Sequence, residues 1–584
     1  MSKIIVFATP VFLLLIALEF FWSRSRASRT AGQQVYRLND AINSISLGIL
    51  SQLSGVLTKV LSVGIYTVVF GAVAWYPHPE FWNTWYGLLL ALVFYDLCYY
   101  WQHRAGHVVA LFWAAHVAHH QSQHYNLSTA LRQTSSGAFL GWIFYLPMAL
   151  AGVPPLVFGA VALVDLLYQF WVHTEQVGKL GWFDRWFCSP SNHRVHHAVN
   201  DGYIDKNYGG ILVLWDRLFG SFQEEHEKCV YGTRGPLNSW DPLWANAEVY
   251  WALAQASWRT RHWSDKVRVW LKPPGWQPAD LARSHPYPTF QLAAVSTYDP
   301  PLSRGQQWFA ALQFVLALVA VSLFLWNAEP MGSGEAALWV GALSAAMWGL
   351  GLFMQGRLST LELLVLESAA VATLGSVGLL DLALVFKPLT MAIAIVFVAV
   401  RAYSTGAKDL FHHQFDTVLV GALLFSLVGD VFLMLPGGNY FIPGLASFLV
   451  AHLFYIALFR QGQAWFPHRA ALVYALALGA SMYAVLWGSL GDPALKVAVA
   501  AYVTVISLMA AQAMGRARVL GDSNSHWVAV GACVFMASDA LIAVDKFLSP
   551  VPLAPLWILG TYYCAQMVIV HHARPAPPIS PAHR

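Results

Sequence analysis

The chain has 584 residues, of which 57% are hydrophobic and only 11% are charged. Because soluble domains carry about 25% charged residues, this composition excludes an ordinary soluble enzyme and places most of the chain in lipid. The net charge of +4 is unremarkable, and we expect no nucleic-acid partner. The five cysteines include no C-x-x-C pair, which argues against a disulfide framework or a thiolate metal site.

Apolar segments long enough to cross about 30 Å of hydrocarbon begin at the N-terminus. Those of the N-terminal half lie near 3–23, 50–75 and 82–101, followed by a broken pair at 137–151 and 154–173. The Pro154-Pro155 break predicts a short hairpin for that pair. Residues 174–306 are polar and aromatic, which predicts a soluble-facing cap followed by a linker.

The C-terminal part of the chain is a series of apolar segments joined by short loops. Two lie near 307–326 and 336–354, and eight more lie near 362–380, 383–401, 416–436, 442–460, 469–489, 494–514, 527–546 and 553–571. This order predicts an all-α polytopic membrane protein that ends in an eight-helix membrane domain.

The loops between these segments separate by charge. Basic residues follow the first apolar segment and recur on the same side of the membrane in the cap, at Arg24, Arg26, Arg29, Arg259, Arg261, Lys266, Arg268 and Lys272. The opposite loops carry acidic residues, at Glu329, Glu335, Asp381 and Asp492. Because cytoplasmic loops are enriched in Lys and Arg, we expect a retained N-terminal anchor, a cytoplasmic cap and a bacterial inner membrane.

Three short histidine clusters lie on the predicted cytoplasmic side. They consist of His103 and His107, then His116, His119 and His120, and then His193, His196 and His197. If the first two clusters are helical, their spacings of three and four place the rings on one helix face. Imidazole binds Fe, Zn, Cu and Ni, and so many rings are too many for one ion. We therefore predict a two-metal site held by nitrogen; the alternative, polar residues on loop faces, does not account for two H-x-x-H-H motifs.

Other polar residues stand at helical spacing from these clusters. His173 lies level with them at the end of the hairpin and is predicted as a ninth ligand. Ligand histidines usually donate their second N–H to a carboxylate or carbonyl, so Asp96 and Asp165 are predicted supports; the alternative for Asp96 is a buried carboxylate that caps a neighbouring helix. Glu175 is either a proton carrier or a surface charge. His124 and His226 match neither cluster.

The motifs around the histidines resemble the fatty acid hydroxylase/sterol desaturase superfamily, and within it the alkylglycerol monooxygenases. The resemblance covers about residues 40–225 and rests on WAAHVAHH at 113–120, YNLSTALRQ at 125–133, SPSNHRVHH at 189–197 and YIDKNYGG at 203–210. It implies a non-haem di-iron site that activates O₂. It also implies hydroxylation of the carbon next to an ether oxygen with tetrahydrobiopterin as reductant, and release of a fatty aldehyde. Val177 stands where other members have a second histidine after His173, which favours nine ligands over ten.

Few polar residues interrupt the last eight apolar segments, and those few are informative. Lys387, Asp430, His452 and Asp539 fall inside hydrocarbon-length segments. Charged residues in lipid normally face one another or a wet cavity. Two carboxylates and a lysine suit acid/base hydrolysis, and from the chemistry alone they suit a proton or ion transporter equally well.

The same segments resemble the YhhN/lysoplasmalogenase family over about residues 360–575. The resemblance rests on FKPLT at 386–390, GD at 429–430, FLVAHLFY at 448–455 and SD at 538–539. It implies hydrolysis of the vinyl-ether bond of lysoplasmalogens to a fatty aldehyde and a glycerophospho-headgroup. Since that reaction begins with protonation of the enol carbon, we expect Asp430 and Asp539 to be acid and base, with Lys387 setting their charge balance.

The sequence therefore predicts a bifunctional membrane enzyme that cleaves ether lipids. Its expected parts are a di-iron hydroxylase domain at 1–300, connecting helices at 301–359 and a lysoplasmalogenase-like domain at 360–575. The expected cofactors are two Fe ions and O₂, with an electron donor supplied in trans. The alternative is a sterol or fatty-acyl hydroxylase or desaturase with a transporter-like or non-catalytic C-terminal domain.

Overall fold

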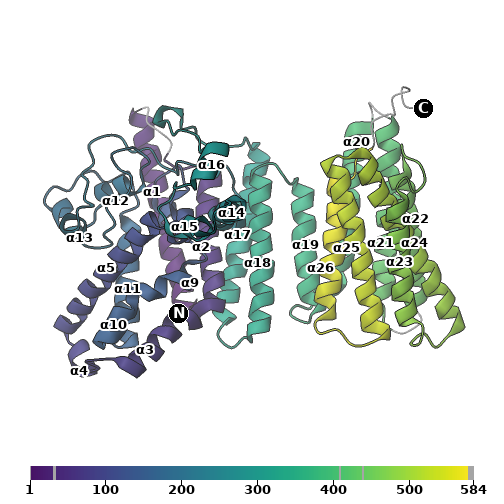
Figure 1. The fold of residues 1–584 in the computed structure, drawn as a ribbon, viewed down its shortest axis with the longest axis horizontal. Helices are drawn as coiled ribbons and strands as arrows, with labels where there is room; N and C mark the ends of the chain where they lie inside the picture. Colours follow the sequence, from purple (N-terminus) through teal and green to yellow (C-terminus); the bar gives the residue numbers. More distant parts are fainter. Residues whose placement is uncertain (1, 31–34, 407–409, 437–439, 576–584) are drawn as a thin grey trace. The chain divides into compact units, whose positions relative to one another are not determined.

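The computed structural model describes residues 2–30, 35–406, 410–436 and 440–575. The chain forms two compact units, Met1–Arg357 and Leu358–Arg584, and Figure 1 labels most of their helices. Within the described ranges there is no strand, and extended backbone pairs only in two isolated bridges, Phe187 with Leu212 and Ala198 with Tyr231. The prediction of an all-α protein is confirmed.

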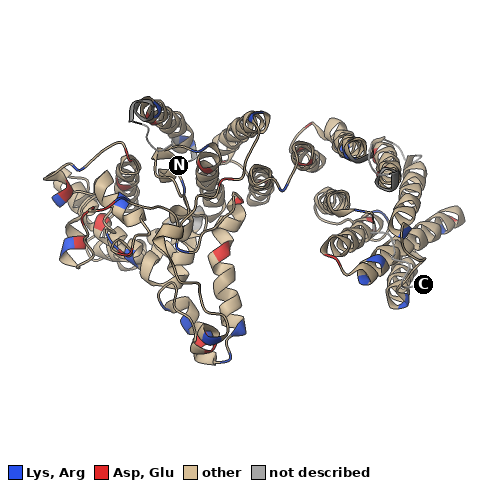
Figure 2. Ribbon diagram, turned by 90° about the horizontal axis from the view of Figure 1, so that it is seen from above, with Lys and Arg blue, Asp and Glu red and all other residues tan. Residues whose placement is uncertain are grey.

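Ten helices in the described part of the chain are long and apolar enough to cross a membrane. They are α1 (Ser2–Thr30), α2 (Leu38–Lys59), α17 (Arg304–Asn327), α18 (Ser333–Met354), α20 (Ala383–Gly406), α21 (Leu410–Met434), α22 (Phe441–Arg460), α23 (Arg469–Leu486), α24 (Pro493–Leu520) and α25 (Ser523–Phe547). Figure 2 shows how little of the ribbon carries an acidic or basic residue. The chain is a multi-pass membrane protein.

Four further helices match predicted apolar segments but are shorter or less apolar. They are α5 (Trp85–Val108), α11 (Pro155–Trp171), α19 (Thr360–Ser376) and α26 (Ala554–His572). Helix α5 continues past the predicted end at 101 and carries His103 and His107 on its last turns. Helix α11 packs against α5, so the first histidine cluster and the residues before His173 lie on neighbouring helices.

The second predicted segment begins too late. The structure starts α2 at Leu38 rather than near residue 50, and continues it through a π-helical turn, Val60–Gly64, into α3 (Ile65–Val73). The first turns of α2 carry the polar residues Asp40, Asn43 and Ser44, which lie outside the apolar segment predicted at 50–75. These side chains are buried against protein instead of lipid, so they are compatible with a helix at the centre of the first unit.

The helices of the predicted connector pack within the first unit. Helix α17 packs against α1 and α2, while α18 packs against α2 and α14 (Pro242–Arg259). Both helices therefore belong to the first unit, which extends to Arg357. The division of this unit into a hydroxylase domain at 1–300 and connecting helices at 301–359 stays a prediction.

The cap of the first unit is built from short helices. They are α6 (Ala110–Ala114), α7 (Val117–His120), α8 (Leu127–Ala130), α12 (Pro190–His197), α13 (Leu214–Leu218), α15 (Trp263–Leu271) and α16 (Ala279–Ser284). The Ser189 hydroxyl caps α12 by accepting from the Asn192 backbone N–H, and Pro190 occupies its first turn. The serine cap and the proline set the start of α12, and the third histidine cluster lies on its remaining turns up to His197.

The second unit is the predicted eight-helix bundle, α19 to α26. Successive helices pack side by side except for α22 and α23, which both pack against α24, and α19 also packs against α26. Its continuous apolar core includes Phe415, Phe459, Met509 and Phe535, which are at most 1% exposed. The few polar residues of these helices are described below, because they interrupt this core.

Helix α2 comes very close to the main chain of Leu131, the residue before Arg132. A Cβ placed on Gly48 would lie 2.3 Å from the carbonyl oxygen of Leu131. Gly55, two turns further along the same helix, has no atom within 4 Å of the equivalent position. Glycine at position 48 therefore sets the distance between α2 and the loop that carries Arg132.

Gly48→Ala is expected to lower the free energy of unfolding by about 1–3 kcal/mol, because the added methyl group must push a main-chain carbonyl away. Denaturant unfolding of the protein in detergent, followed by tryptophan fluorescence, measures the change. Gly55→Ala is the matched control and should leave the unfolding midpoint unchanged or slightly raised. Equal midpoints for the two variants would contradict the close contact.

Candidate metal centre and membrane carboxylate site

The structure brings all nine predicted histidines together, and they form two groups. One group, called here the five-histidine group, contains His103, His107, His116, His120 and His196. The other, called the four-histidine group, contains His119, His173, His193 and His197. Within each group the candidate ligand nitrogens lie within 4.8 Å of one another. His226 belongs to neither group among the described residues, nor does His124.

The H-x-x-H-H motif itself explains why there are two groups. In a helix, residues i and i+4 project in nearly the same direction, whereas the neighbouring residues i+3 and i+4 diverge by about 100°. Each motif therefore sends its outer pair to one group and its middle histidine to the other. The second cluster gives His116 and His120 to the five-histidine group and His119 to the four-histidine group, and the third gives His193 and His197 to the latter and His196 to the former.

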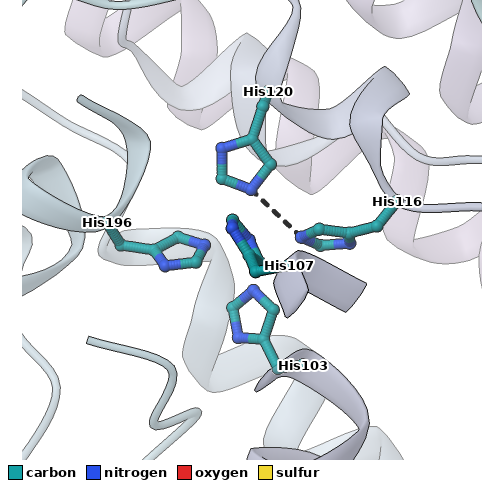
Figure 3. A group of neighbouring side chains, drawn as sticks. All are labelled: His103, His107, His116, His120 and His196. Carbon is teal, nitrogen blue, oxygen red and sulfur yellow. Dashed lines mark hydrogen bonds between the residues drawn. The ribbon is translucent and has the colours of Figure 1, made fainter. Parts of the chain in front are cut away.

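The rings of the five-histidine group surround one point (Figure 3). The Nε2 atoms of His116 and His120 are 3.0 Å apart, and the ring centroids of His103 and His196 are 4.3 Å apart. The Nε2 atoms of His103, His107 and His196 are buried and have no hydrogen-bond partner among the described residues. Their unpaired nitrogens are what a bound cation would satisfy.

The four-histidine group is a chain of facing Nε2 atoms. The Nε2 of His173 is 3.2 Å from the Nε2 of His119 and 3.1 Å from the Nε2 of His193. The Nε2 atoms of His193 and His197 are 3.2 Å apart. Nitrogen ligands sit about 2.1 Å from a zinc ion, so two of them are about 3.0 Å apart at a right angle and about 3.4 Å apart at a tetrahedral angle. The observed spacings match nitrogens that share one ion.

Hydrogen bonds on the far side of the rings decide which nitrogen carries the proton. The Nδ1 atoms of His103, His119, His173 and His196 face the main-chain carbonyls of Tyr208, Arg132, Gln169 and Lys206 at 2.8–3.0 Å. A carbonyl only accepts, so Nδ1 carries the hydrogen and Nε2 of a neutral ring has a bare lone pair. His119 and His173 thus present two lone pairs to each other, an arrangement that a cation stabilises and a hydrogen bond cannot.

Burial keeps these rings in the form that binds metal. It lowers the pKa of His119 to about 4, and the positive charge of Arg132 acts in the same direction. Burial also lowers the pKa well below its usual value for the other cap histidines, His116, His120, His193, His196 and His197. Metal binding requires neutral imidazole, so no proton has to be removed at neutral pH.

The predicted carboxylate supports do not bond to the histidines, because the carbonyls above take that role. Asp96 instead accepts from the backbone N–H groups of Ile211 and Leu212 and from the indole of Trp215. Asp96 thereby anchors the loop that supplies the Tyr208 carbonyl to His103. Its backbone donors precede α13, so it does not cap that helix either. Asp165 accepts from the side chain of Gln169 at 2.5 Å and has no hydrogen bond to His173.

Glu175 lies one layer further out. Its carboxylate accepts from the Tyr231 hydroxyl at 3.1 Å, and the Tyr231 ring stacks on Tyr125 at a centroid distance of 4.9 Å. Tyr125 in turn contacts the ring of His197, with centroids 5.2 Å apart. Glu175 is exposed and touches no member of the histidine groups.

Arg132 is a support that sequence reasoning missed. It is 1% exposed, and its guanidinium donates to the Ala118 carbonyl at 2.6 Å and to Asn43 Oδ1 at 2.7 Å. Its own carbonyl accepts from His119. Burial lowers the pKa of Arg132 to about 10, which leaves it charged at neutral pH. The signal was present in the Ala-Leu-Arg-Gln motif, but only the fold shows that this arginine points inward.

A second polar site lies inside the eight-helix bundle. The Tyr562 hydroxyl on α26 donates to Asp430 Oδ2 on α21 at 2.7 Å. The Tyr502 hydroxyl on α24 donates to Asp539 Oδ2 on α25 at 2.5 Å. The charges of Lys387 and Asp539 both act on Asp430. The three predicted residues therefore belong to one electrostatic neighbourhood, and Tyr502, Tyr562 and His452 complete it.

Comparison with known proteins gives each unit a family. The fatty acid hydroxylase family matches residues 88–221, and the YhhN family matches residues 382–573. The alkylglycerol monooxygenase of Danio rerio is 34% identical over 402 residues, which are 68% of this chain and 86% of that protein. The Homo sapiens alkylglycerol monooxygenase is 40% identical over 274 residues, 46% of this chain and 59% of that protein.

The relatives of the second unit are of a different kind. Lysoplasmalogenase TMEM86A of Homo sapiens is 38% identical over 168 residues, which are 28% of this chain and 68% of that protein. No solved structure matches the chain. The chain therefore belongs to the alkylglycerol monooxygenases of the fatty acid hydroxylase family, joined to a unit of the YhhN family that includes lysoplasmalogenases.

Proposed function

We propose that this protein is a bifunctional membrane enzyme that cleaves ether lipids by two different reactions. The first unit uses O₂ to hydroxylate the carbon next to the ether oxygen of an alkylglycerol, and the hemiacetal so formed breaks down to a fatty aldehyde. The second unit hydrolyses the vinyl-ether bond of a lysoplasmalogen to a fatty aldehyde. The observation that carries the proposal is that one chain is similar to both an alkylglycerol monooxygenase and a lysoplasmalogenase.

The two histidine groups are proposed to hold two iron ions, one in each group. The fit rests on nitrogen-only donor sets of five and four whose lone pairs lack other partners. Bound iron would supply the redox chemistry that activates O₂. The chain's own contribution is to keep the rings neutral and oriented, through burial and the carbonyl hydrogen bonds. The reductant comes from outside the chain, and tetrahydrobiopterin is the proposed donor.

The histidine groups are proposed to face the cytoplasm. The backbone N–H of Ala110, three residues after His107, donates to the Lys272 carbonyl at 2.9 Å, so the end of α5 adjoins the basic cap segment. Basic loops are typical of the cytoplasmic side. We propose a bacterial inner membrane as the location, with residues 1–357 as the oxidising domain and the remainder as the hydrolytic one.

In the second unit we propose Asp430 as the acid that protonates the enol carbon and Asp539 as part of the base. Asp430 is 8% exposed, and a buried carboxylic acid in lipid favours its neutral, proton-donating form. Lys387 adjusts the local charge. Each residue receives a hydrogen bond or a charge from a different helix, so the site exists only in the folded bundle.

His173→Ala is expected to reduce the bound metal of purified protein from two ions toward one per chain, since it leaves three donors in the four-histidine group and all five in the other. Inductively coupled plasma mass spectrometry measures the change. His226→Ala, an exposed histidine outside both groups, is the matched control and should keep both ions. Two ions retained in His173→Ala would contradict the assignment of one ion to each group.

The two activities should be separable by single substitutions. Asp430→Asn removes the proposed acid and is expected to lower vinyl-ether hydrolysis by about 10²-fold or more, with alkylglycerol oxidation unchanged. His173→Ala should give the reverse. Mass spectrometry of lipid products from alkylglycerol with O₂ and tetrahydrobiopterin, and from lysoplasmalogen without them, measures both.

Three outcomes would contradict the proposed function. Accumulation of a hydroxylated or unsaturated lipid without aldehyde would favour a sterol or fatty-acyl hydroxylase or desaturase. Absence of aldehyde from lysoplasmalogen with the intact chain would favour a transporter-like or non-catalytic second unit. Parallel loss of both activities in either variant, with unchanged unfolding midpoints, would contradict two independent sites.

A further inference from the structure

The second unit contains a buried histidine with an unused nitrogen. His452 lies on α22 and is 0% exposed. Its Nε2 is 3.0 Å from the Tyr502 hydroxyl and 3.3 Å from Asp539 Oδ2. Its Nδ1 is buried and has no hydrogen-bond partner in the described ranges. A polar atom left unpaired in a membrane core calls for a ligand or a water molecule.

The hydrogen bonds around His452 fix its tautomer. The Tyr502 hydroxyl donates its proton to Asp539, so both oxygens that face Nε2 are acceptors. The proton of the neutral ring therefore lies on Nε2, and Nδ1 carries a free lone pair. Residues of three helices, α22, α24 and α25, form this arrangement. It leaves the basic Nδ1 of His452 without a protein partner among the described residues.

The ring of His452 lies across a phenylalanine from the proposed acid. The Phe535 ring contacts His452 with centroids 4.8 Å apart and Tyr562 with centroids 5.5 Å apart. Tyr562 is the residue that holds Asp430. Phe535 thus contacts both the imidazole and the tyrosine that holds the proposed acid, so the two polar groups border the same apolar side chain.

We propose that His452 is the catalytic base that activates water in vinyl-ether hydrolysis, and that Asp539 and Tyr502 are positioning residues that hold its Nε2–H. The inference rests on the proposed function of the second unit and replaces Asp539 as the direct base. A carboxylate that orients an imidazole while the opposite nitrogen takes a proton is an established catalytic arrangement. No oxidant or reductant is involved.

Asp430 gives its proton to the enol β-carbon, where the π electrons form the new C–H bond, and positive charge develops on the carbon that bears the ether oxygen. Water attacks that carbon and its proton passes to His452 Nδ1. The hemiacetal then breaks its bond to the glycerol oxygen, which takes the proton from His452, while the hemiacetal hydroxyl returns a proton to Asp430.

Hydrolysis in D₂O distinguishes proton transfer from Asp430 from water activation by His452. The assay uses the full-length protein in detergent with lysoplasmalogen as substrate. In the wild type the aldehyde should carry one deuterium next to the carbonyl, with little label in recovered substrate. His452→Gln keeps an N–H toward Asp539 but has no basic nitrogen. Its aldehyde formation should fall about 10²-fold or more, and recovered lysoplasmalogen should gain deuterium at the vinyl carbon, because the protonated species reverts when water is not activated.

Asp430→Asn should show neither aldehyde nor label, because the proton is never transferred. His526→Gln, on the exposed face of α25, is the matched control and should behave as the wild type. Tyr502→Phe removes a single oxygen and serves as the second, less disruptive variant. It should lower kcat without changing KM and should also label recovered substrate, as should Asp539→Asn.

Full turnover in His452→Gln would overturn the proposal. Loss of turnover without label in both His452→Gln and Tyr502→Phe, at unchanged unfolding midpoints, would also overturn it, because the defect would then lie in the acid step. A wild type that releases no aldehyde from lysoplasmalogen would instead remove the proposed function of the unit, and the role of His452 with it.

Discussion

The first unit is organised around imidazole lone pairs that face one another inside a buried cap. His119 and His173 are held by carbonyls on one side, so their bare nitrogens meet at 3.2 Å on the other. Two facing lone pairs repel each other, and a cation bound between them would join His119 of the cap to His173 at the end of α11. The surrounding structure supplies what the rings need: the buried Arg132 anchors the loop behind His119, and Asp96 anchors the loop behind His103.

The second unit relies on acidic and hydroxyl side chains where the first unit uses imidazoles. Its polar groups are carboxylates and tyrosines within a continuous apolar core, where each charge needs a partner on another helix. Asp430 and Asp539 are each held by one tyrosine hydroxyl. One chain thus combines a nitrogen-lined centre suited to redox metal with a site built from carboxylates, tyrosines and a histidine.

The metal centre was largely predictable from sequence, because H-x-x-H-H spacing is local and helical geometry converts it into direction. The motif separates the middle histidine from the outer pair, but which group each one joins was not anticipated, since it depends on how α7 and α12 meet. Asp96 was given the wrong partner because its spacing from His103 on α5 cannot reveal a loop 115 residues away. The start of α2 was missed because buried Asn43 and Ser44 resemble loop residues until Arg132 is placed against them.

The bundle was predicted well as a fold and less completely as a site. Long apolar segments determine the eight helices, and a carboxylate in lipid is conspicuous in any sequence. Tyr502 carried no such signal, because tyrosines are common in membrane helices and only packing brings this one to Asp539. His452 was visible as a buried polar residue, but its role depends on which ring nitrogen is occupied.

X-ray absorption at the iron edge of the purified protein tests the central claim most directly. Two donor sets of five and four histidines predict a shell dominated by nitrogen, with imidazole scattering that corresponds to four or five rings per iron. A shell rich in carboxylate oxygen, or one with two or fewer imidazoles per iron, would contradict the account.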